Sequence, residues 1–151
     1  MHVLITTDGS QQSLEAARHL KSFADPSSID DVTVLAVVSP LAAVPFANDA
    51  ETGPQELEDF SFRQAAERAT RSIADELGSW NTRLTTEVRG GSPAGEIVRA
   101  ARELGAGLIV MASRSSRTEA VLMGSVAHRV LSHAPCPVLV HRPAKRGRAR
   151  A

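Results

Sequence analysis

The chain has 151 residues, of which 42% are hydrophobic and 23% charged, and its formal net charge at pH 7 is zero. This length suits one domain with a sizeable core, and the composition is that of an ordinary soluble protein. The single cysteine excludes an intrachain disulfide, and no apolar run reaches the roughly 20 residues that span a bilayer. A strand-like segment follows Met1 directly, without the pattern of a secretory leader, so we expect a cytoplasmic protein.

Two strand–helix pairs fill the first half of the chain. Apolar residues predict a strand over His2–Thr7, and helical spacing of apolar residues predicts a helix over Ser10–Ala24. The continuous apolar run Val32–Val38 is typical of a strand covered on both faces of a parallel sheet. Residues 39–55 are irregular and rich in proline, alanine and glycine, and a long helix is expected over Gln55–Leu77.

The second half continues the alternation. A polar–apolar alternation predicts a strand near a sheet edge, and a glycine-rich turn with Ser92 as cap and Pro93 at the first helical position predicts the start of a further helix. A buried strand, a short helix and a last strand follow. The expected segments are a strand over Thr82–Val88, a helix with Ile97, Val98, Ala101 and Leu104 on its buried face, a strand over Leu108–Met111, a helix over Gly124–His133 and a strand over Pro137–His141.

Strands that alternate with helices indicate βαβ crossovers and a parallel sheet. We therefore predict an α/β fold, a single doubly wound domain over residues 1–141. The last strand lies among prolines, which are confined to edge strands and strand starts, so it is expected at an edge. Its apolar residues Val138, Leu139 and Val140 make it a candidate seam for a homodimer.

The net charge of zero conceals an asymmetry. Five basic residues and no acidic residue lie in residues 142–151, which leaves a formal charge of −5 on residues 1–141. We expect this segment to be a solvated, disordered tail. An arm that touches nucleic acid or an acidic face is the alternative, but a few charges without interleaved aromatic residues are weak support for binding nucleic acid.

Two polar segments follow strands whose carboxyl ends would meet in an open parallel sheet, which is where such folds bind ligands. Asp8 leaves the first strand, and its carboxylate suits hydrogen bonds from a ribose or a position near a metal ion; equally, Asp8 or Ser10 would serve as a helix cap. The loop Ala112–Ser125 offers hydroxyl groups, arginines and a helix N-terminus, which together suit an anion; equally, it would serve as a polar surface loop.

Over nearly its whole length the chain resembles the universal stress protein family. The segments that carry the resemblance are VLITTDGSQQSLEAARHL, GGSPAGEIVRAARELGAGLIVMAS and, most specifically, GSVAHRVLSHAPCPVLV. The resemblance implies a five-stranded parallel sheet in the order 3-2-1-4-5 with helices on both faces. It also implies a cytoplasmic dimer that acts in stress adaptation.

Nucleotide-binding members of that family carry a loop of Gly, two residues, Gly, nine residues, then Gly-Ser or Gly-Thr. The matching positions here are Ala112, Ser113 with Arg114, Ser115, eight further residues and Gly124-Ser125. Both early glycines are therefore replaced and the loop is one residue shorter. A Cβ where the backbone needs left-handed geometry costs roughly 1–2 kcal/mol, so we expect weakened nucleotide binding.

By the resemblance, ATP or AMP, with Mg²⁺ accompanying ATP, would lie between Asp8 at the ribose, Val37 at the base, and Ala112, Ser113, Ser115, Gly124 and Ser125 at the phosphates. Any hydrolysis of ATP is expected to be slow, because Asp8 is the one general base at hand. The alternative hypothesis is a nucleotide-free, dimeric interaction module that has lost its ATP loop. No metal site is predicted, since the histidines lack metal-ligand spacing.

Two enzyme classes are excluded on the evidence of their sequence motifs. Gly90-Gly91-Ser92-Pro93-Ala94 resembles the turn that carries a hydrolase nucleophile, but Pro93 has no N–H to donate to an oxyanion. The sequence has no Gly-x-x-x-x-Gly-Lys loop, so it is not a P-loop nucleotidase.

Overall fold

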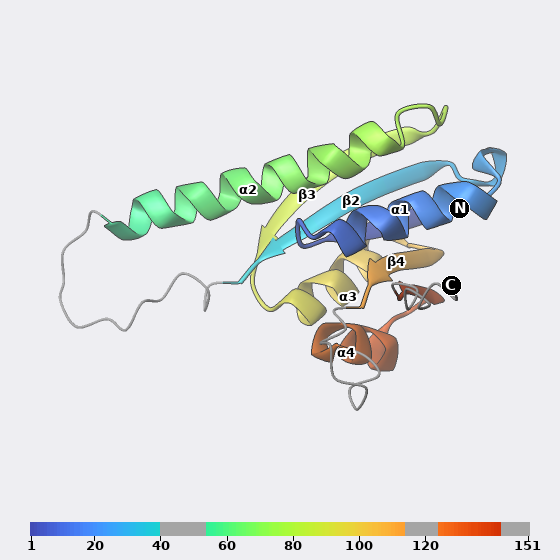
Figure 1. Cartoon of the computed structure of the whole chain (residues 1–151). Helices are drawn as coiled ribbons and strands as arrows, with labels where there is room; N and C mark the ends of the chain where they lie inside the picture. Colours follow the sequence, from blue (N-terminus) through green and yellow to red (C-terminus); the bar gives the residue numbers. More distant parts are fainter. Residues whose placement is uncertain (40–53, 114–123, 143–151) are drawn as a thin grey trace, which may run out of the picture.

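The computed structural model describes residues 1–39, 54–113 and 124–142, with side chains omitted for residues 54–59. Strands and helices alternate along the described chain, as the sequence predicts (Figure 1). In order they are β1 (His2–Thr7), α1 (Gln11–Phe23), the short 3₁₀ helix η1 (Pro26–Ser28), β2 (Asp31–Val38), α2 (Pro54–Glu76), β3 (Arg83–Gly90), α3 (Pro93–Leu104), β4 (Leu108–Ala112), α4 (Ser125–His133) and β5 (Val138–His141).

The five strands form one sheet in the order β3-β2-β1-β4-β5, and every neighbouring pair is parallel. The predicted sheet order is therefore confirmed. Val3 of β1 aligns with Val32 of β2 on one side and with Leu108 of β4 on the other. The chain moves outward in one direction from β1 to β3 and in the opposite direction from β4 to β5. The strand order thus reverses between β1 and β4, the position at which open sheets of this kind form a crevice.

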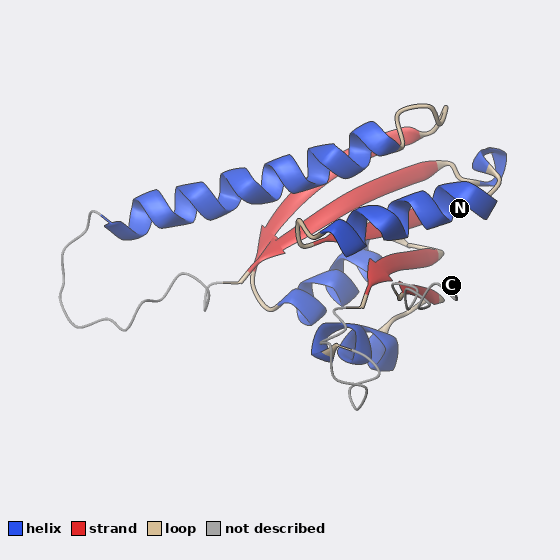
Figure 2. Ribbon diagram, viewed as in Figure 1, coloured by secondary structure: helices blue, strands red, loops and turns tan. Residues whose placement is uncertain are grey.

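Helices cover both faces of the sheet, as predicted (Figure 2). Successive side chains of a strand point to opposite faces, so the fully buried residues of β1 divide between two cores. Val3 and Ile5 pack with α1 and α2, whereas Leu4 packs with α3 and α4. Within the described ranges, no helix combines the length and apolarity that crossing a bilayer requires.

The helix starts show which predicted caps form. Ser10 caps α1, because its Oγ accepts a hydrogen bond of 3.2 Å from the N–H of Ser13. Ser92 precedes α3 and Pro93 begins it, as predicted, but the Ser92 side chain makes no capping hydrogen bond. The stretch after α1, predicted only as a break, forms η1: Asp25 accepts from the N–H and the Oγ of Ser27, and these bonds lower the pKa of the Asp25 carboxyl.

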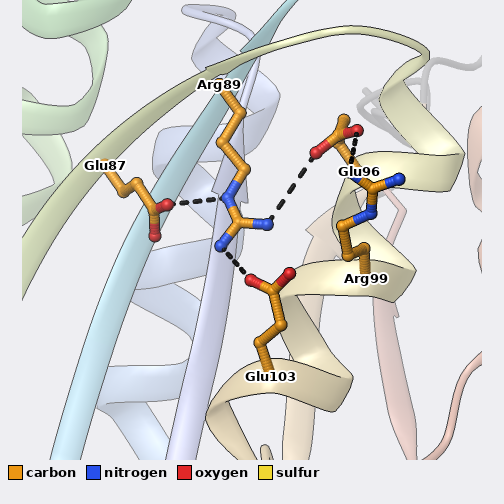
Figure 3. A network of polar contacts seen from close by, with 5 residues as sticks. All are labelled: Glu87, Arg89, Glu96, Arg99 and Glu103. Carbon is orange, nitrogen blue, oxygen red and sulfur yellow. Dashed lines mark hydrogen bonds and ion pairs between the residues drawn. The ribbon is translucent and has the colours of Figure 1, made fainter.

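An ion-pair network joins edge strand β3 to α3 (Figure 3). The guanidinium of Arg89 lies 2.7 Å from a carboxylate oxygen of Glu87 on the same strand and 2.7 Å from one of Glu103 on α3. Glu96 is a more distant partner at 3.8 Å and also pairs with Arg99 at 3.5 Å. The Arg89 side chain is only 16% exposed. The hydrogen bond with Glu87, more than any other contact, raises the pKa of Arg89 further above its usual range, so this cation is permanent.

Candidate functional site

An open cleft of about 1030 Å³ lies at the carboxyl ends of the central strands. It is where the strand order reverses, so the fold itself places it. Five of the seven predicted site residues line this cleft, namely Asp8, Val37, Ala112, Gly124 and Ser125. Segments that are more than a hundred residues apart in sequence are thereby brought to one place. Of the other two, Ser113 is buried beside the cleft and Ser115 lies outside the described residues.

The loop after β1 presents Asp8 on the cleft wall. Asp8 is exposed, and its Oδ1 accepts a hydrogen bond of 2.9 Å from the N–H of Ser10. Gly9 has a φ of +80°, a left-handed conformation that glycine adopts without strain. Thus Ser10 caps the helix while Asp8 shapes the turn before it. The helix cap therefore does not account for the position of Asp8, which lines the cleft at the edge where open sheets of this kind bind ligands.

On the opposite side of the switch point, β4 leads toward α4. Gly124 stands at the N-cap of α4, one residue before the helix proper, so the helix begins at Ser125 rather than at Gly124 as predicted. The first helical hydrogen bond runs from the N–H of His128 to the carbonyl of Gly124. Earlier N–H groups of such a helix have no acceptor within it, and Ser125 and Val126 line the cleft. This end of α4 suits an anion.

Ala112 is the last residue of β4, where it pairs with His141 of β5. A strand residue has negative φ, so the left-handed geometry considered for this position is wrong for the backbone in this structure. The Cβ of Ala112 therefore adds no strain in the backbone. The expected cost of losing the first loop glycine is limited to the space that one methyl group occupies at the cleft wall.

Ser113 and Val37 differ in how far they are buried. Ser113 has no exposed surface, and its Oγ accepts a long hydrogen bond of 3.4 Å from the N–H of Gly124. Val37, near the end of β2, is partly buried and lines the cleft as predicted. Val37 thus lines the cleft together with Asp8 and Ser125, whereas Ser113 supports the start of α4 from a buried position.

Helix α2 supplies a wall that the sequence analysis did not assign to the site. Six of its residues line the cleft: Phe62, Ala65, Ala66, Arg68, Ala69 and Ser72. The stripe of apolar residues in this segment predicts a buried helix face, and Ile73 and Leu77 are indeed buried. Phe62 continues that stripe but remains 41% exposed. The sequence does contain a signal for this wall, because the run of apolar residues along α2 is longer than the strands that the helix covers.

Comparison with known proteins agrees with this architecture. The universal stress protein family matches residues 1–142 of the chain. A universal stress protein of Methanocaldococcus jannaschii is 36% identical over 146 residues, which is 95% of this chain and 83% of that protein.

Solved structures share the fold at lower identity. A universal stress protein in complex with cAMP superposes with a TM-score of 0.67 at 24% identity, covering 93% of this chain and 96% of that one. An Arabidopsis thaliana universal stress protein family protein with AMP bound superposes with a TM-score of 0.64 at 13% identity, covering 94% and 91%. On the family match and the identity to the M. jannaschii protein, this chain belongs to the universal stress protein family.

Proposed function

We propose that this protein is a cytoplasmic, nucleotide-binding regulator of stress adaptation that holds ATP or AMP in the cleft at the switch point. The observation that carries the proposal is the meeting of Asp8, Val37, Gly124 and Ser125 around one cleft of about 1030 Å³. A site of this size accommodates a ligand of several hundred daltons. The cAMP and AMP bound to two proteins of the same fold support the class of ligand.

Each wall offers a group suited to one part of a nucleotide. The carboxylate of Asp8 suits hydrogen bonds from ribose hydroxyls, and backbone groups near Val37 suit the edge of a base. The N-terminus of α4 at Gly124 and Ser125 suits a phosphate. Mg²⁺ would accompany ATP through the phosphates. Ala112 fits this arrangement, because its strand geometry carries no backbone strain.

The proposal implies binding and signalling rather than rapid turnover. Asp8 is the one acidic residue among the described residues that line the cleft, and the proposal assigns it to the ribose. Among the described residues that line the cleft, no other side chain suits the role of a general base that activates a water molecule. Release of phosphate from ATP is therefore expected to be slow compared with exchange of the nucleotide.

The first experiment is calorimetric titration with Mg-ATP and with AMP, after mass spectrometry for nucleotide that co-purifies. We expect a dissociation constant in the micromolar range. Asp8→Asn should weaken binding by about tenfold, because it removes the charge that strengthens the hydrogen bonds from the ribose. Gly124→Val should abolish binding, since its branched side chain would stand where the phosphate approaches.

The chain offers a matched control for Asp8→Asn. Asp25 forms the same kind of turn, accepting from the N–H of Ser27 at 2.9 Å, but lies outside the cleft lining. Asp25→Asn should leave nucleotide affinity at the wild-type value. No heat and no bound nucleotide with ATP at millimolar concentration would overturn the proposal and favour the nucleotide-free interaction module.

We also propose that the protein acts as a homodimer through β5. Among the described strands β5 has a neighbour on one side only, and its residues Val138, Leu139 and Val140 are all partly exposed. An apolar edge strand is a template for pairing with another copy. Light scattering at micromolar concentration should give twice the mass of one chain; a monomer would contradict the proposal.

A further inference from the structure

Helix α2 is longer than the strands it covers. It has 23 residues, against eight in β2 and eight in β3. At helical and extended rises per residue these correspond to about 35 Å and about 27 Å. The last turn of α2 is fixed to α1, where Glu76 pairs with Arg18 at 3.2 Å and its carbonyl accepts from Lys21 at 2.9 Å. The excess length therefore lies at the N-terminal end of α2, which extends past the carboxyl ends of the strands (Figure 1).

The middle of α2 passes over the loop that carries Asp8. A Cβ placed on Gly9 would lie 3.7 Å from the Cβ of Ala69, so α2 and the loop after β1 are in direct contact. Phe62 precedes Ala69 by about two helical turns, or roughly 10 Å along the axis. The segment of α2 from Phe62 to Ser72 is therefore a wall of the same cleft that Asp8 and Ser125 line.

Phe62 gives this wall an aromatic face. It lines the cleft and is 41% exposed, although a phenylalanine on the apolar stripe of a helix is usually buried. Its neighbours along the wall, Ala65 and Ala66, are small residues. An accessible aromatic ring inside a polar cleft suits stacking against a flat, aromatic ligand such as a nucleobase.

Arg68 gives the same wall a positive charge. Among the described residues that line the cleft it is the sole cation, and Asp8 is the sole anion. Arg63 on the same helix pairs with Glu67 at 3.8 Å, whereas Arg68 makes no ion pair with any residue in the described ranges. Its guanidinium is therefore available to a ligand. Without it, this part of the lining would carry only the negative charge of Asp8, which repels phosphate.

We propose that α2 is the wall that selects the ligand, with Phe62 stacking on the base and Arg68 pairing with a phosphate. The inference rests on the proposed function and adds to it a class of preferred ligand. A molecule with both an aromatic base and a phosphate satisfies both residues. A nucleoside satisfies only Phe62, and a sugar phosphate satisfies only Arg68, so both bind more weakly than a nucleotide.

The test titrates adenosine, AMP, Mg-ATP and ribose 5-phosphate into wild type and matched variants by calorimetry. Phe62→Leu should weaken adenosine, AMP and ATP by similar factors of about three to ten, because only stacking is lost. Arg68→Gln should weaken AMP and ATP by about tenfold, the effect of one charge-assisted hydrogen bond, and leave adenosine unchanged.

Two residues of the same helix provide the controls. Phe60 is 61% exposed and does not line the cleft, and Arg71 is an exposed arginine that borders a separate groove against β3. Phe60→Leu and Arg71→Gln should bind every probe as wild type does. Thermal unfolding of all four variants should match wild type, because the replaced side chains are exposed.

The outcomes separate this inference from the proposed function. If wild type binds neither AMP nor ATP, the proposed function fails and the inference fails with it. If wild type binds nucleotide but Phe62→Leu and Arg68→Gln bind within twofold of wild type, α2 does not select the ligand and only the inference is overturned. A loss of adenosine affinity in Arg68→Gln equal to the loss for AMP would also contradict it, because the arginine would then not act through the phosphate.

Discussion

The Oγ of Ser113 accepts a hydrogen bond of 3.4 Å from the N–H of Gly124, across eleven residues of sequence. It joins the end of β4 to the start of α4, the two elements that flank the proposed phosphate site. Ser113 has no exposed surface, so water does not replace the hydroxyl when this bond is lost. The two ends of the intervening loop are thus held together by one buried hydroxyl.

We expect Ser113→Ala to lower the free energy of unfolding by about 1 kcal/mol, the net worth of one hydrogen bond. Chemical denaturation measures this change. Ser132 is the control, because its Oγ instead donates a hydrogen bond to the carbonyl of His128 on the exposed side of α4. Ser132→Ala should change stability by less than about 0.5 kcal/mol. Equal effects of the two substitutions would contradict the structural role of Ser113.

Gly9→Ala and Gly95→Ala should change stability in opposite directions. At Gly9 the φ of +80° strains any residue with a Cβ, and we expect a loss of about 1–2 kcal/mol. At Gly95, inside α3, a new Cβ would lie 3.8 Å from that of Ser92, an ordinary contact, and the helix should gain up to about 1 kcal/mol. Thermal unfolding of both variants measures the difference; a stabilised Gly9→Ala protein would show that this turn is not left-handed in solution.

Removing the cation at the centre of the network between β3 and α3 should destabilise the protein. Arg89→Met leaves the carboxylates of Glu87, Glu96 and Glu103 close together without their shared partner, and we expect a loss of about 1–3 kcal/mol.

The control for this change is Arg99, which is 66% exposed and pairs only with Glu96 at 3.5 Å. Arg99→Met should cost less than about 0.5 kcal/mol, as exposed pairs generally do. Urea denaturation at low and at high salt distinguishes the two, because screening of the three carboxylates should reduce the loss in Arg89→Met. An Arg89→Met protein as stable as the Arg99→Met protein would refute a structural role for the network.

The pKa of the Cys136 thiol is raised, chiefly because burial disfavours the thiolate. The thiolate is the reactive form, so alkylation by iodoacetamide should be slower than that of a free thiol such as glutathione. The rate should still be rising with pH where that of glutathione has levelled off, because deprotonation requires higher pH than in an exposed cysteine. Mass spectrometry across a pH series measures this. A rate equal to that of glutathione throughout would show that the side chain is not buried in solution.

Most of the fold could be predicted from local patterns. Apolar runs gave β1, β2 and β4 within one or two residues, and Ser10 and Pro93 marked the helix starts that the structure has. The sheet order came from the resemblance to a family, since alternating strands and helices are compatible with several orders. The short helix η1 was read only as a break, because a proline among serines and an aspartate signals a turn of any kind.

The site was harder to predict, for two physical reasons. A helical stripe shows which residues share a face but not where the sheet beneath them ends, so Phe62 was grouped with buried Ile73 and Leu77. Likewise, Ser113 is one of several hydroxyl-bearing residues in its segment, and only the tertiary structure shows that it is buried. Arg68 carried no local signal, because an arginine on a long helix is usually a solvated charge.

The two edges of the sheet differ in chemistry. The β3 edge carries exposed Arg83, Thr85 and Thr86 beside the charged network, whereas β5 is apolar. Polar edges resist pairing with another strand. When two copies pair through their β5 edges, these apolar edges are covered. The polar β3 edges then lie at the two ends of the combined sheet. If β5 forms the dimer proposed above, the same asymmetry limits pairing through the edges of the described sheet to two copies.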